Sequence, residues 1–308
     1  MAQTPWGDLP VADAHVHFFS HRFYSSLAAQ KKLADAAALG PLLEWEIPGS
    51  DAIALAKRWV TELDRCGVSR AALIASIPED ESSVEAAVAA YPDRFFGFFM
   101  VDPLRPGAHE RVRAVLERKR LRCLCLFPAM HGYSITDPRI VPTLEAAADQ
   151  RAIVFVHCGT LSVGIRKKLG LASPFDMRYS NPIDLHPVAL HFPQIRFIVP
   201  HFGAGYFREA LMLADLVPNV YLDSSSTNRW MAYDPSGLDL RTVFRRSIEL
   251  LGHKRLLFGT DSSFFPRGWH ATVFEQQVKV LYELGLDESE ARLILHDNLT
   301  GLFQTAPD

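Results

Sequence analysis

The chain has 308 residues, of which 48% are hydrophobic and 22% are charged, and its formal net charge is −3. This composition excludes a disordered chain or a coiled coil and suffices for one large α/β domain or two smaller ones. Because basic side chains are not gathered in one block and the isoelectric point is near 6.5, we expect no nucleic-acid partner. We identify neither a signal peptide nor an apolar run of roughly 18–20 residues, and therefore expect a cytoplasmic protein without membrane contact.

Short apolar runs alternate with helical patterns along the chain. The expected strands are residues 11–18, 70–77, 95–101, 121–127, 152–157, 195–199, 220–224 and 255–258. The expected helices are residues 52–63, 81–90, 108–119, 138–150, 206–217, 240–251, 272–284 and 288–302. The stretch 21–50 is interrupted by Gly40-Pro41 and Pro48-Gly49, so we expect an irregular excursion after the first strand. Asp287 with Glu290 three positions later predicts a capping box.

Eight nearly continuous apolar strands with helices between them predict a parallel sheet that is buried on both faces. Eight is the number of strands that closes a barrel, so the predicted fold is a single (β/α)8 TIM barrel over residues 1–308, with an insertion at about 20–50. The main alternative is an open doubly wound sheet. It is disfavoured because no GxGxxG follows the first strand and no GxxxxGK[ST] occurs.

Polar residues occur where the carboxyl ends of several expected strands would meet, which is where such barrels place their active sites. Strand one carries His15 and His17, strand five ends at His157, strand six leads into His201, and strand eight leads into Asp261. Three imidazoles and a carboxylate from strands one, five and eight are a suitable ligand set for one divalent ion, with His201 nearby.

Other polar residues of these strands are expected to have structural roles. Alternation along strand one predicts that Asp13 shares a face with His15 and His17, but we expect it to form interior hydrogen bonds rather than to bind metal. Cys123 and Cys125 alternate within an apolar strand and are expected to be buried thiols.

Five motifs, taken in this order, resemble the amidohydrolase superfamily, in the subgroup related to aminocarboxymuconate semialdehyde decarboxylase. They are Asp13-Ala14-His15-Val16-His17, Val156-His157-Cys158-Gly159, Pro200-His201-Phe202-Gly203, Phe258-Gly259-Thr260-Asp261 and the tail Asn298-Leu299-Thr300-Gly301-Leu302-Phe303. The resemblance implies that His15, His17, His157 and Asp261 hold one divalent metal ion, usually zinc, and that His201 is a catalytic acid or base. Manganese, iron or cobalt would also suit these ligands. Many relatives are homodimers.

The chain departs from relatives of this kind in three places. Binuclear relatives use a carboxylated lysine, commonly on strand four, but residues 121–127 contain none, so we expect a mononuclear site. The subgroup's SDxP turn is replaced by Thr260-Asp261-Ser262-Ser263-Phe264-Phe265-Pro266. Relatives that decarboxylate aromatic acids often carry glutamate in place of the first histidine, and His15 argues against that type.

These features predict a metal-dependent hydrolase of a small ester, lactone or amide. Asp261 would orient a water molecule and take its proton, while His201 would polarise the carbonyl group or shuttle the proton. A decarboxylase or hydratase that uses the same metal is the first alternative. A non-catalytic barrel that serves as a binding protein is the second.

The expected substrate is a small molecule that carries a carboxylate or an aromatic ring. Arg22, Arg178 and Arg229 follow strands one, five and seven, where an arginine could grip a carboxylate in a bidentate manner, and Asn228 could donate a hydrogen bond there. The alternative for each arginine is a solvated or ion-paired surface position. Residues 161–186 and the 21–50 stretch are expected to shape the substrate pocket.

Overall fold

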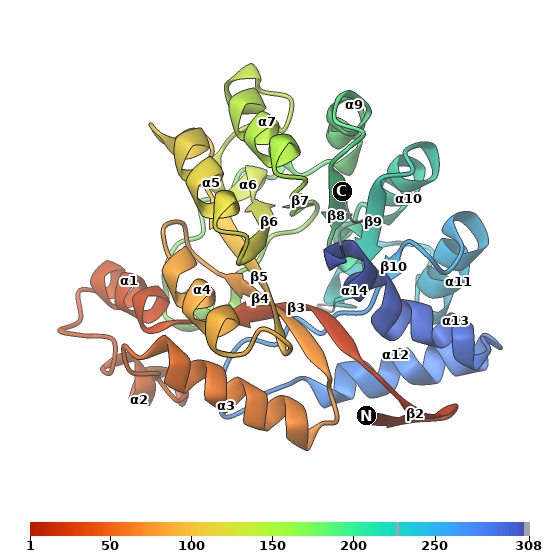
Figure 1. Ribbon diagram of the computed structural model, residues 1–308, viewed down its shortest axis with the longest axis horizontal. Coiled ribbons are helices and arrows are strands. Elements are labelled where there is room, and N and C mark those ends of the chain that lie inside the picture. Colours follow the sequence, from red (N-terminus) through yellow and green to blue (C-terminus); the bar gives the residue numbers. More distant parts are fainter. Residues whose placement is uncertain (226–227, 305–308) are drawn as a thin grey trace.

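The computed structural model describes residues 1–225 and 228–304, except for the side chain of Asn228. Eight parallel strands form the centre of the molecule and helices surround them, as Figure 1 shows. The strands follow one another around the barrel in chain order, from β3 to β10. They are β3 (Ala12–Phe18), β4 (Arg70–Ala75), β5 (Phe95–Val101), β6 (Leu121–Leu126), β7 (Ile153–Val156), β8 (Arg196–Val199), β9 (Val220–Asp223) and β10 (Leu256–Leu257). The prediction of a (β/α)8 barrel is confirmed.

The barrel closes where β3 meets the segment that follows β10. The backbone N–H of Ala14 donates to the carbonyl of Phe258 at 2.8 Å, and that of His17 donates to Ser262 at 2.7 Å. In the opposite direction, the N–H of Asp261 donates to the carbonyl of His15 at 3.0 Å. Two expected site residues are therefore joined through their own backbones, although 246 positions separate them in the chain.

The helices pack an apolar face against the outside of the barrel. In α3, the side chain of Asp51 caps the first turn by accepting from the N–H of Ile53 at 2.8 Å, and Ala56, Trp59 and Leu63 form the buried face. The α-helices are α1 (His21–Lys31), α2 (Leu39–Leu43), α3 (Ala52–Arg65), α4 (Glu81–Ala90), α5 (Ala108–Glu117), α6 (Pro128–His131), α7 (Val141–Asp149), α8 (Gly164–Lys168), α9 (His186–His191), α10 (Phe207–Leu216), α11 (Leu240–Leu251), α12 (Ala271–Glu283), α13 (Glu288–Arg292) and α14 (Asn298–Phe303). A short antiparallel hairpin of β1 (Ala2–Thr4) and β2 (Gly7–Leu9) precedes the barrel.

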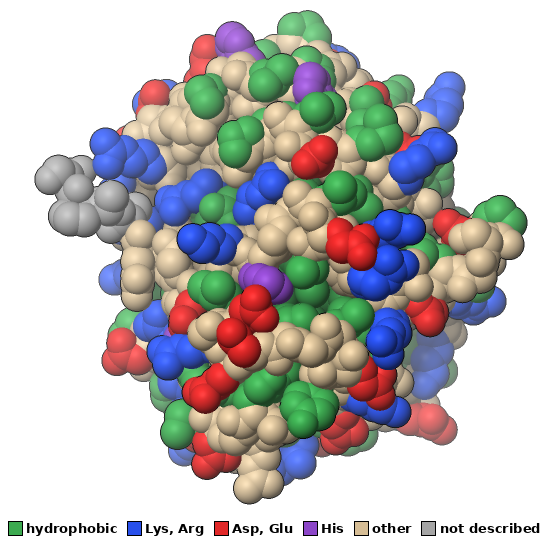
Figure 2. Space-filling model, turned by 90° about the vertical axis from the view of Figure 1, so that its right-hand side faces the viewer, with side chains coloured by type: hydrophobic (Ala, Val, Ile, Leu, Met, Phe, Trp, Pro, Cys, Tyr) green, Lys and Arg blue, Asp and Glu red, His purple; other side chains and the backbone are tan. Residues whose placement is uncertain are grey.

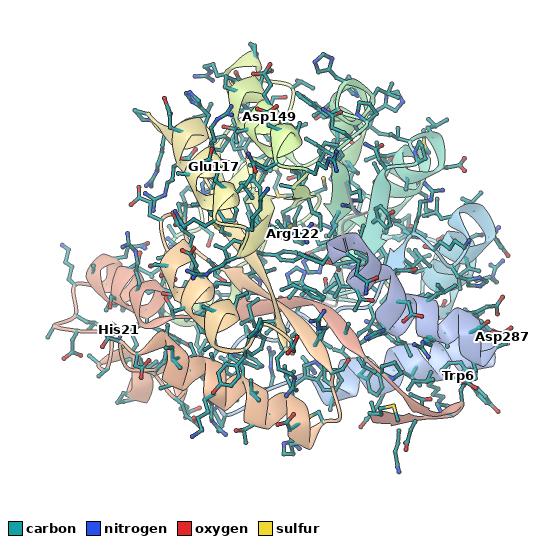
Figure 3. The ribbon with its side chains drawn as sticks, in the orientation of Figure 1. Trp6, His21, Glu117, Arg122, Asp149 and Asp287 are labelled. Carbon is teal, nitrogen blue, oxygen red and sulfur yellow. The ribbon has the colours of Figure 1, made fainter. Side chains whose placement is uncertain are left out.

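The last helix, α14, covers the end of the barrel at which the strands begin (Figure 1). Its Leu299, Leu302 and Phe303 join the apolar cluster inside the barrel. Arg122, labelled in Figure 3, donates to the carbonyl of Phe303 at 2.5 Å. The opposite end of the barrel, where the strands finish, remains available for a functional site.

The prediction of an irregular 21–50 stretch is wrong, because the stretch contains α1 and α2. Ser20 caps α1 by accepting from the N–H of Phe23 at 3.1 Å. Phe23, Tyr24 and Leu27 then form the buried face of α1. These residues belong to a small apolar cluster of their own, separate from the barrel core.

The final helical pattern is interrupted rather than continuous. A π-helical segment, Leu293–Asp297, separates α13 from α14. Within it, the carbonyl of Ile294 accepts from the N–H of Phe258 at 3.0 Å, so the irregularity lets the helix hydrogen-bond to the residue that follows β10. The predicted capping box of Asp287 and Glu290 is confirmed.

On the face seen in Figure 2, basic and acidic side chains are interspersed with small hydrophobic groups. No helix within the described residues has the combination of length and apolar character that is needed to cross a bilayer.

Candidate metal centre and active-site cavity

A β-bulge in β3 brings two histidines to the mouth of the barrel. The pairing of β3 with β4 shifts register between Asp13 and Val16. Ala14 lies in the interior apolar cluster, whereas Val16 lies in the outer one. The expectation that Asp13 shares a face with His15 and His17 is therefore wrong, because the extra residue interrupts the alternation.

Asp13 instead connects β3 to the segment that carries Asp261. One of its carboxylate oxygens accepts from the N–H groups of His15 at 2.9 Å and Thr260 at 3.1 Å. The other accepts from the indole of Trp269 at 2.7 Å and the hydroxyl of Thr260 at 2.5 Å. Burial raises the pKa of Asp13 to about 6, although these hydrogen bonds act in the opposite direction. The expected hydrogen-bonding role of Asp13 is thus observed.

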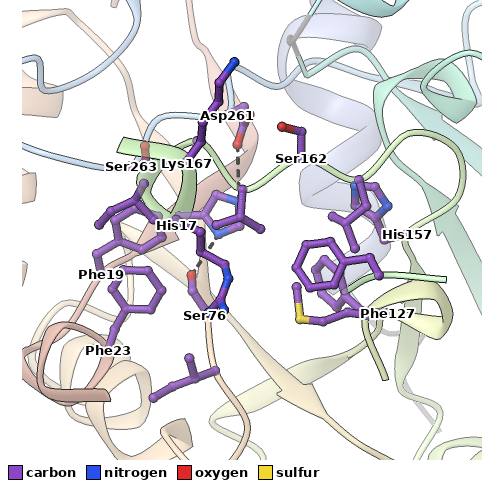
Figure 4. Close-up of a pocket in the computed structure, with 18 of the residues that line it drawn as sticks. His17, Phe19, Phe23, Ser76, Phe127, His157, Ser162, Lys167, Asp261 and Ser263 are labelled. Atoms are coloured by element: carbon purple, nitrogen blue, oxygen red, sulfur yellow. Dashed lines mark hydrogen bonds and ion pairs between the residues drawn. The ribbon is translucent and has the colours of Figure 1, made fainter. Parts of the chain in front are cut away.

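His15, His17 and Asp261 form a compact group at the carboxyl ends of the strands. Oδ1 of Asp261 lies 3.3 Å from Nε2 of His17 and 3.7 Å from Nε2 of His15. Figure 4 shows the contact between His17 and Asp261 in the cavity. Two metal–ligand bonds of roughly 2.0–2.1 Å at a tetrahedral angle place the ligand atoms about 3.3–3.4 Å apart. The separation between His17 and Asp261 has this value, and that between His15 and Asp261 is slightly longer.

The hydrogen bonds of the two histidines indicate which nitrogen is available to a metal. Nδ1 of His15 lies 3.0 Å from Oδ2 of Asp223, a group that can only accept when ionised. Nδ1 of His17 lies 2.8 Å from Oγ of Ser76, and that hydroxyl donates to the carbonyl of Ile74 at 3.0 Å. Both imidazoles are thus set to carry their proton on Nδ1 and to direct the lone pair of Nε2 towards Asp261. A cation between the two lone pairs and the carboxylate would satisfy all three, so the group fits a divalent metal ion.

His157 lies in the same cavity but outside this compact group. Its ring stacks on Phe127 with 5.3 Å between centroids and lies 5.4 Å from the ring of His201 (Figure 4 shows the pair with Phe127). Its Nδ1 atom is buried without a hydrogen-bond partner among the described residues. Burial, followed by the neighbouring His201 and His15, holds the pKa of His157 well below its usual value, so the ring is neutral. An orphaned polar atom here is consistent with metal binding, but its role as fourth ligand stays a prediction.

His201 is held by the strand-end residues of β9. Its Nδ1 donates to the carbonyl of Ser225 at 2.8 Å, which leaves Nε2 with a free lone pair. Its backbone N–H donates to Oδ1 of Asp223 at 3.2 Å. The φ angle of His201 is 55°, a left-handed conformation that is uncommon for residues other than glycine. Burial and the neighbouring His15 lower the pKa of His201, and the imidazole is therefore a base in its resting form.

Asp261 is an ionised carboxylate with a constrained backbone. Burial alone would raise its pKa, but contact with His17 and the surrounding imidazoles of His15 and His201 hold the pKa well below the usual range. Its φ angle is 60°, again left-handed. Both expected catalytic residues thus share an uncommon backbone conformation at the cavity.

Two glycines allow the loops that carry these residues to approach closely. A Cβ atom on Gly159, whose φ is 77°, would lie 2.1 Å from the carbonyl oxygen of Gly203. A Cβ atom on Gly259 would lie 2.8 Å from that of Ser225 and 3.2 Å from that of His15. The motifs after β7, β8 and β10 therefore depend on glycine for their packing.

The site opens into a cavity of about 850 Å³. Its inner wall is formed by polar residues of the strand ends, including His15, His17, His157, His201 and Asp261. Its outer wall is largely apolar, with some basic side chains in the lining, and is formed in part by the 21–50 stretch and by the segment after β10. The aromatic members of that wall include Phe19, Phe23, Trp45 and Phe264. The volume is that of a pocket for a small molecule.

The residues predicted to bind substrate lie in different places. Arg229 lines the cavity. Arg22 is exposed and pairs with Glu79 at 3.4 Å. Arg178 is also exposed and pairs with Asp176 at 2.6 Å. Arg22 and Arg178 do not line the cavity. The structure thus shows both in the alternative role that the sequence left open, as ion-paired surface arginines. The side chain of Asn228 lies outside the described part of the chain.

Several functional residues were not identified from the sequence. Asp223 and Ser225 orient His15 and His201, and Ser76 orients His17. The signal for Asp223 was present, since it is a carboxylate at the end of a strand. Arg267, which lines the cavity beside Asp261, follows no strand directly and carried no such signal.

A (β/α)8 barrel that gathers histidines and an aspartate where its strands end has the architecture of an active site. The chain belongs to the amidohydrolase family, whose sequence model matches residues 12–303. It is therefore an enzyme of the amidohydrolase superfamily, as the resemblance predicted. Protein fluG of Emericella nidulans is 36% identical over 87 residues, which is 28% of this chain and 10% of that protein. This chain thus matches only a tenth of the length of that relative.

Solved structures with similar folds include two enzymes of different reaction type. One is a 5-carboxyvanillate decarboxylase from Sphingomonas paucimobilis, at 15% identity and a TM-score of 0.65 over 97% of this chain and 100% of that one. Another is a probable 2-pyrone-4,6-dicarboxylic acid hydrolase from Acinetobacter baumannii with bound citric acid, at 16% identity and a TM-score of 0.63 over 96% and 99%.

Two further structures of this fold contain a metal ion. An amidohydrolase from Burkholderia multivorans holds zinc and is similar at 12% identity, with a TM-score of 0.62 over 96% of this chain and 99% of that one. A 5-carboxyvanillate decarboxylase from Novosphingobium aromaticivorans holds manganese, at 15% identity and a TM-score of 0.62 over 99% and 100%. At these identities the likeness shows the fold alone.

Proposed function

We propose that the chain is a mononuclear metal-dependent hydrolase of a small ester, lactone or amide that carries a carboxylate or an aromatic ring. The observation that carries the proposal is the arrangement of three imidazoles around Asp261. His15 and His17 are oriented by Asp223 and Ser76 so that both Nε2 lone pairs face the carboxylate. The lone pair of His201 Nε2 is free beside them, because its Nδ1 is engaged by Ser225.

In this proposal His15, His17 and Asp261 hold the ion, and His157 completes the set. Zinc is the preferred metal, and manganese, iron and cobalt suit the same ligands. The structures of this fold that contain zinc and manganese support the choice of a divalent ion. When bound, such an ion polarises oxygen and makes water easier to deprotonate near neutral pH.

The residues of the chain supply the proton transfers. Asp261, which is ionised, accepts a proton from the attacking water as the new C–O bond forms at the acyl carbon. The bond to the leaving oxygen or nitrogen then breaks, and the leaving atom takes a proton. His201 Nε2, which is neutral at rest, can relay this proton from Asp261 to the leaving atom. The partly buried aromatic side chains of the outer wall reduce the contact of bulk water with the reacting atoms.

The experiment that tests the proposal compares two substrates with zinc-loaded protein. 2-Pyrone-4,6-dicarboxylate is a carboxylated lactone, and 5-carboxyvanillate is a carboxylated aromatic without a hydrolysable ring. Ring opening of the lactone is followed by its ultraviolet absorbance, and carbon dioxide release is measured for both. We expect ring opening without gas. Gas release without ring opening would contradict hydrolysis and indicate a carboxy-lyase. A protein that retains no zinc after loading and acts on neither substrate would indicate a non-catalytic barrel.

A further inference from the structure

Four side chains from three segments of the chain stack into a column beside the cavity. The rings of Trp45 and Phe264 are parallel within 8°, with 3.7 Å between centroids. The guanidinium of Arg267 lies 4.5 Å from the ring centroid of Phe264, and Nζ of Lys168 lies 5.9 Å from that of Trp45. A cation at each end of two stacked rings is a favourable arrangement, because the faces of the rings are negative. The column joins the segments after α2, after β7 and after β10.

The column places Arg267 next to the proposed metal centre. Its Nη2 atom donates to the backbone carbonyl of Asp261 at 3.2 Å and to Oγ of Ser263 at 3.0 Å. Its Nε and Nη1 atoms donate to none of the described residues. Arg267 is thus oriented by these two hydrogen bonds and by the ring of Phe264, and part of its hydrogen-bonding edge is unused. This segment is also where the chain departs from the SDxP turn of the subgroup that it resembles.

Arg267 is exposed, as are Arg22, Arg139 and Arg178, but it differs from them in having no carboxylate partner among the described residues. Arg22, Arg139 and Arg178 each pair with an acidic side chain within 3.4 Å. Among the described residues, Arg267 forms no ion pair within 4.0 Å. An oriented cation without a counter-ion at the wall of a pocket is suited to an anionic ligand.

The charges of the whole cavity favour the same kind of ligand. Its described lining contains Arg166, Lys167, Arg229 and Arg267, against the single carboxylate of Asp261. The guanidinium of Arg166 is engaged by Ala172 and Gln30, whereas Lys167 and Arg229 have no ion pair with a described residue. Figure 4 shows Lys167 and Asp261 among the lining residues. A bound divalent ion would make the cavity still more positive.

We propose that Arg267 determines the specificity of the site by binding a carboxylate of the substrate beside the reacting bond, and that the Trp45–Phe264 stack positions it. The inference rests on the proposed function, since it names the substrate class of that same site as carboxylates. The guanidinium donates two hydrogen bonds to the substrate carboxylate from its unused edge. Phe264 and Trp45 act through Arg267 and are positioning residues.

The test measures binding rather than turnover, so it does not depend on the reaction. The affinities of zinc-loaded wild-type, R267M and R267K proteins are compared by calorimetry for benzene-1,3-dicarboxylate and for benzamide. Zinc content is determined on the same samples. R139M is the matched control, because Arg139 is an exposed arginine that is paired with Asp137.

We expect R267M to bind benzene-1,3-dicarboxylate about 10- to 100-fold more weakly than the wild-type protein, which is the loss expected for hydrogen bonds to a charged group. R267K should be intermediate, because it keeps the charge but loses the planar fork. Benzamide affinity and zinc content should not change, and R139M should resemble the wild type. Equal binding of the dicarboxylate by wild type and R267M, or no binding by the wild type, would overturn the assignment. Normal binding without ring opening would count against hydrolysis and not against Arg267.

Discussion

Nδ1 of His15 lies 3.0 Å from Oδ2 of Asp223, although 208 positions separate the two residues in the chain. Both side chains are buried, and burial opposes charge on His15, but the nearby carboxylate of Asp223 outweighs it and raises the pKa of His15. The same carboxylate accepts from the backbone N–H of His201 and of Ser225. Asp223 therefore orients both a candidate metal ligand and a candidate catalytic base without lining the cavity itself.

Replacement of Asp223 should weaken metal binding. Without an anionic acceptor for Nδ1, His15 loses both its orientation and part of its basicity, and such partners are worth about 10- to 100-fold in metal affinity. We expect Asp223→Asn to reduce zinc affinity by about this factor, as measured by competition with a chelating dye. Asp93→Asn, at a fully exposed position, is the control. An unchanged zinc affinity in Asp223→Asn would show that this contact does not support a metal ligand.

Replacement of His201 should reduce turnover without loss of metal. Its Nδ1 is engaged by Ser225, and it groups with His15 and Asp223 rather than with His17 and Asp261, so we treat it as a base and not as a ligand. General-base residues contribute about 10²- to 10⁴-fold to the rate. We expect His201→Asn to lower kcat by this factor at unchanged zinc content. His191→Asn, on the surface of α9, should have no effect. Loss of zinc together with activity would instead make His201 a ligand.

Gly159 should not tolerate a side chain. Alanine at this position would need a left-handed backbone and would place its Cβ 2.1 Å from the carbonyl oxygen of Gly203. We expect Gly159→Ala to lower the free energy of unfolding by at least about 2 kcal/mol, as measured by urea denaturation. Gly301→Ala is the control, because a Cβ there meets nothing within 4 Å in α14. It should stabilise the protein by about 0.5–1 kcal/mol. Equal stabilities of the two variants would contradict the packing described for these loops.

The buried thiols should be unreactive in the folded protein. Burial raises the pKa of Cys158 to about 12, so at pH 8 only about one molecule in 10⁴ carries the nucleophilic thiolate. Cys123 and Cys125 are fully buried, as the sequence predicted, and neither forms a disulfide. We expect iodoacetamide to leave these three thiols unmodified at pH 8 and to modify all of them in guanidinium chloride. Rapid modification of Cys158 in the native protein would show that the loop after β7 opens readily.

Much of the barrel is predictable from the sequence, because strands that are buried on both faces are continuous apolar runs. The bounds of β5 and of α4 and α11 are those expected from the pattern. The convergence of His15, His17 and Asp261 was predictable too, since parallel strands that close into a barrel end at one rim.

Features that depend on a single extra residue or on a distant partner were not predictable. The bulge in β3 reverses the side on which Asp13 lies, and no local pattern marks it. The α1 helix was hidden by the glycine and proline pairs that follow it. Arg267 is brought to the cavity by its stacking on Phe264, and Phe264 in turn stacks on Trp45, which is more than 200 positions away. Only the folded chain reveals that order of contacts.

The metal content of the purified protein tests the central claim most directly. Elemental analysis of the wild-type protein after dialysis against zinc should give about one equivalent per chain, and His15→Ala, His17→Ala and Asp261→Ala should each lose it while remaining folded by circular dichroism. Arg139→Met should keep the full equivalent. A wild-type protein that retains no divalent ion, or variants that retain as much zinc as the wild type, would contradict a metal centre built on these three residues.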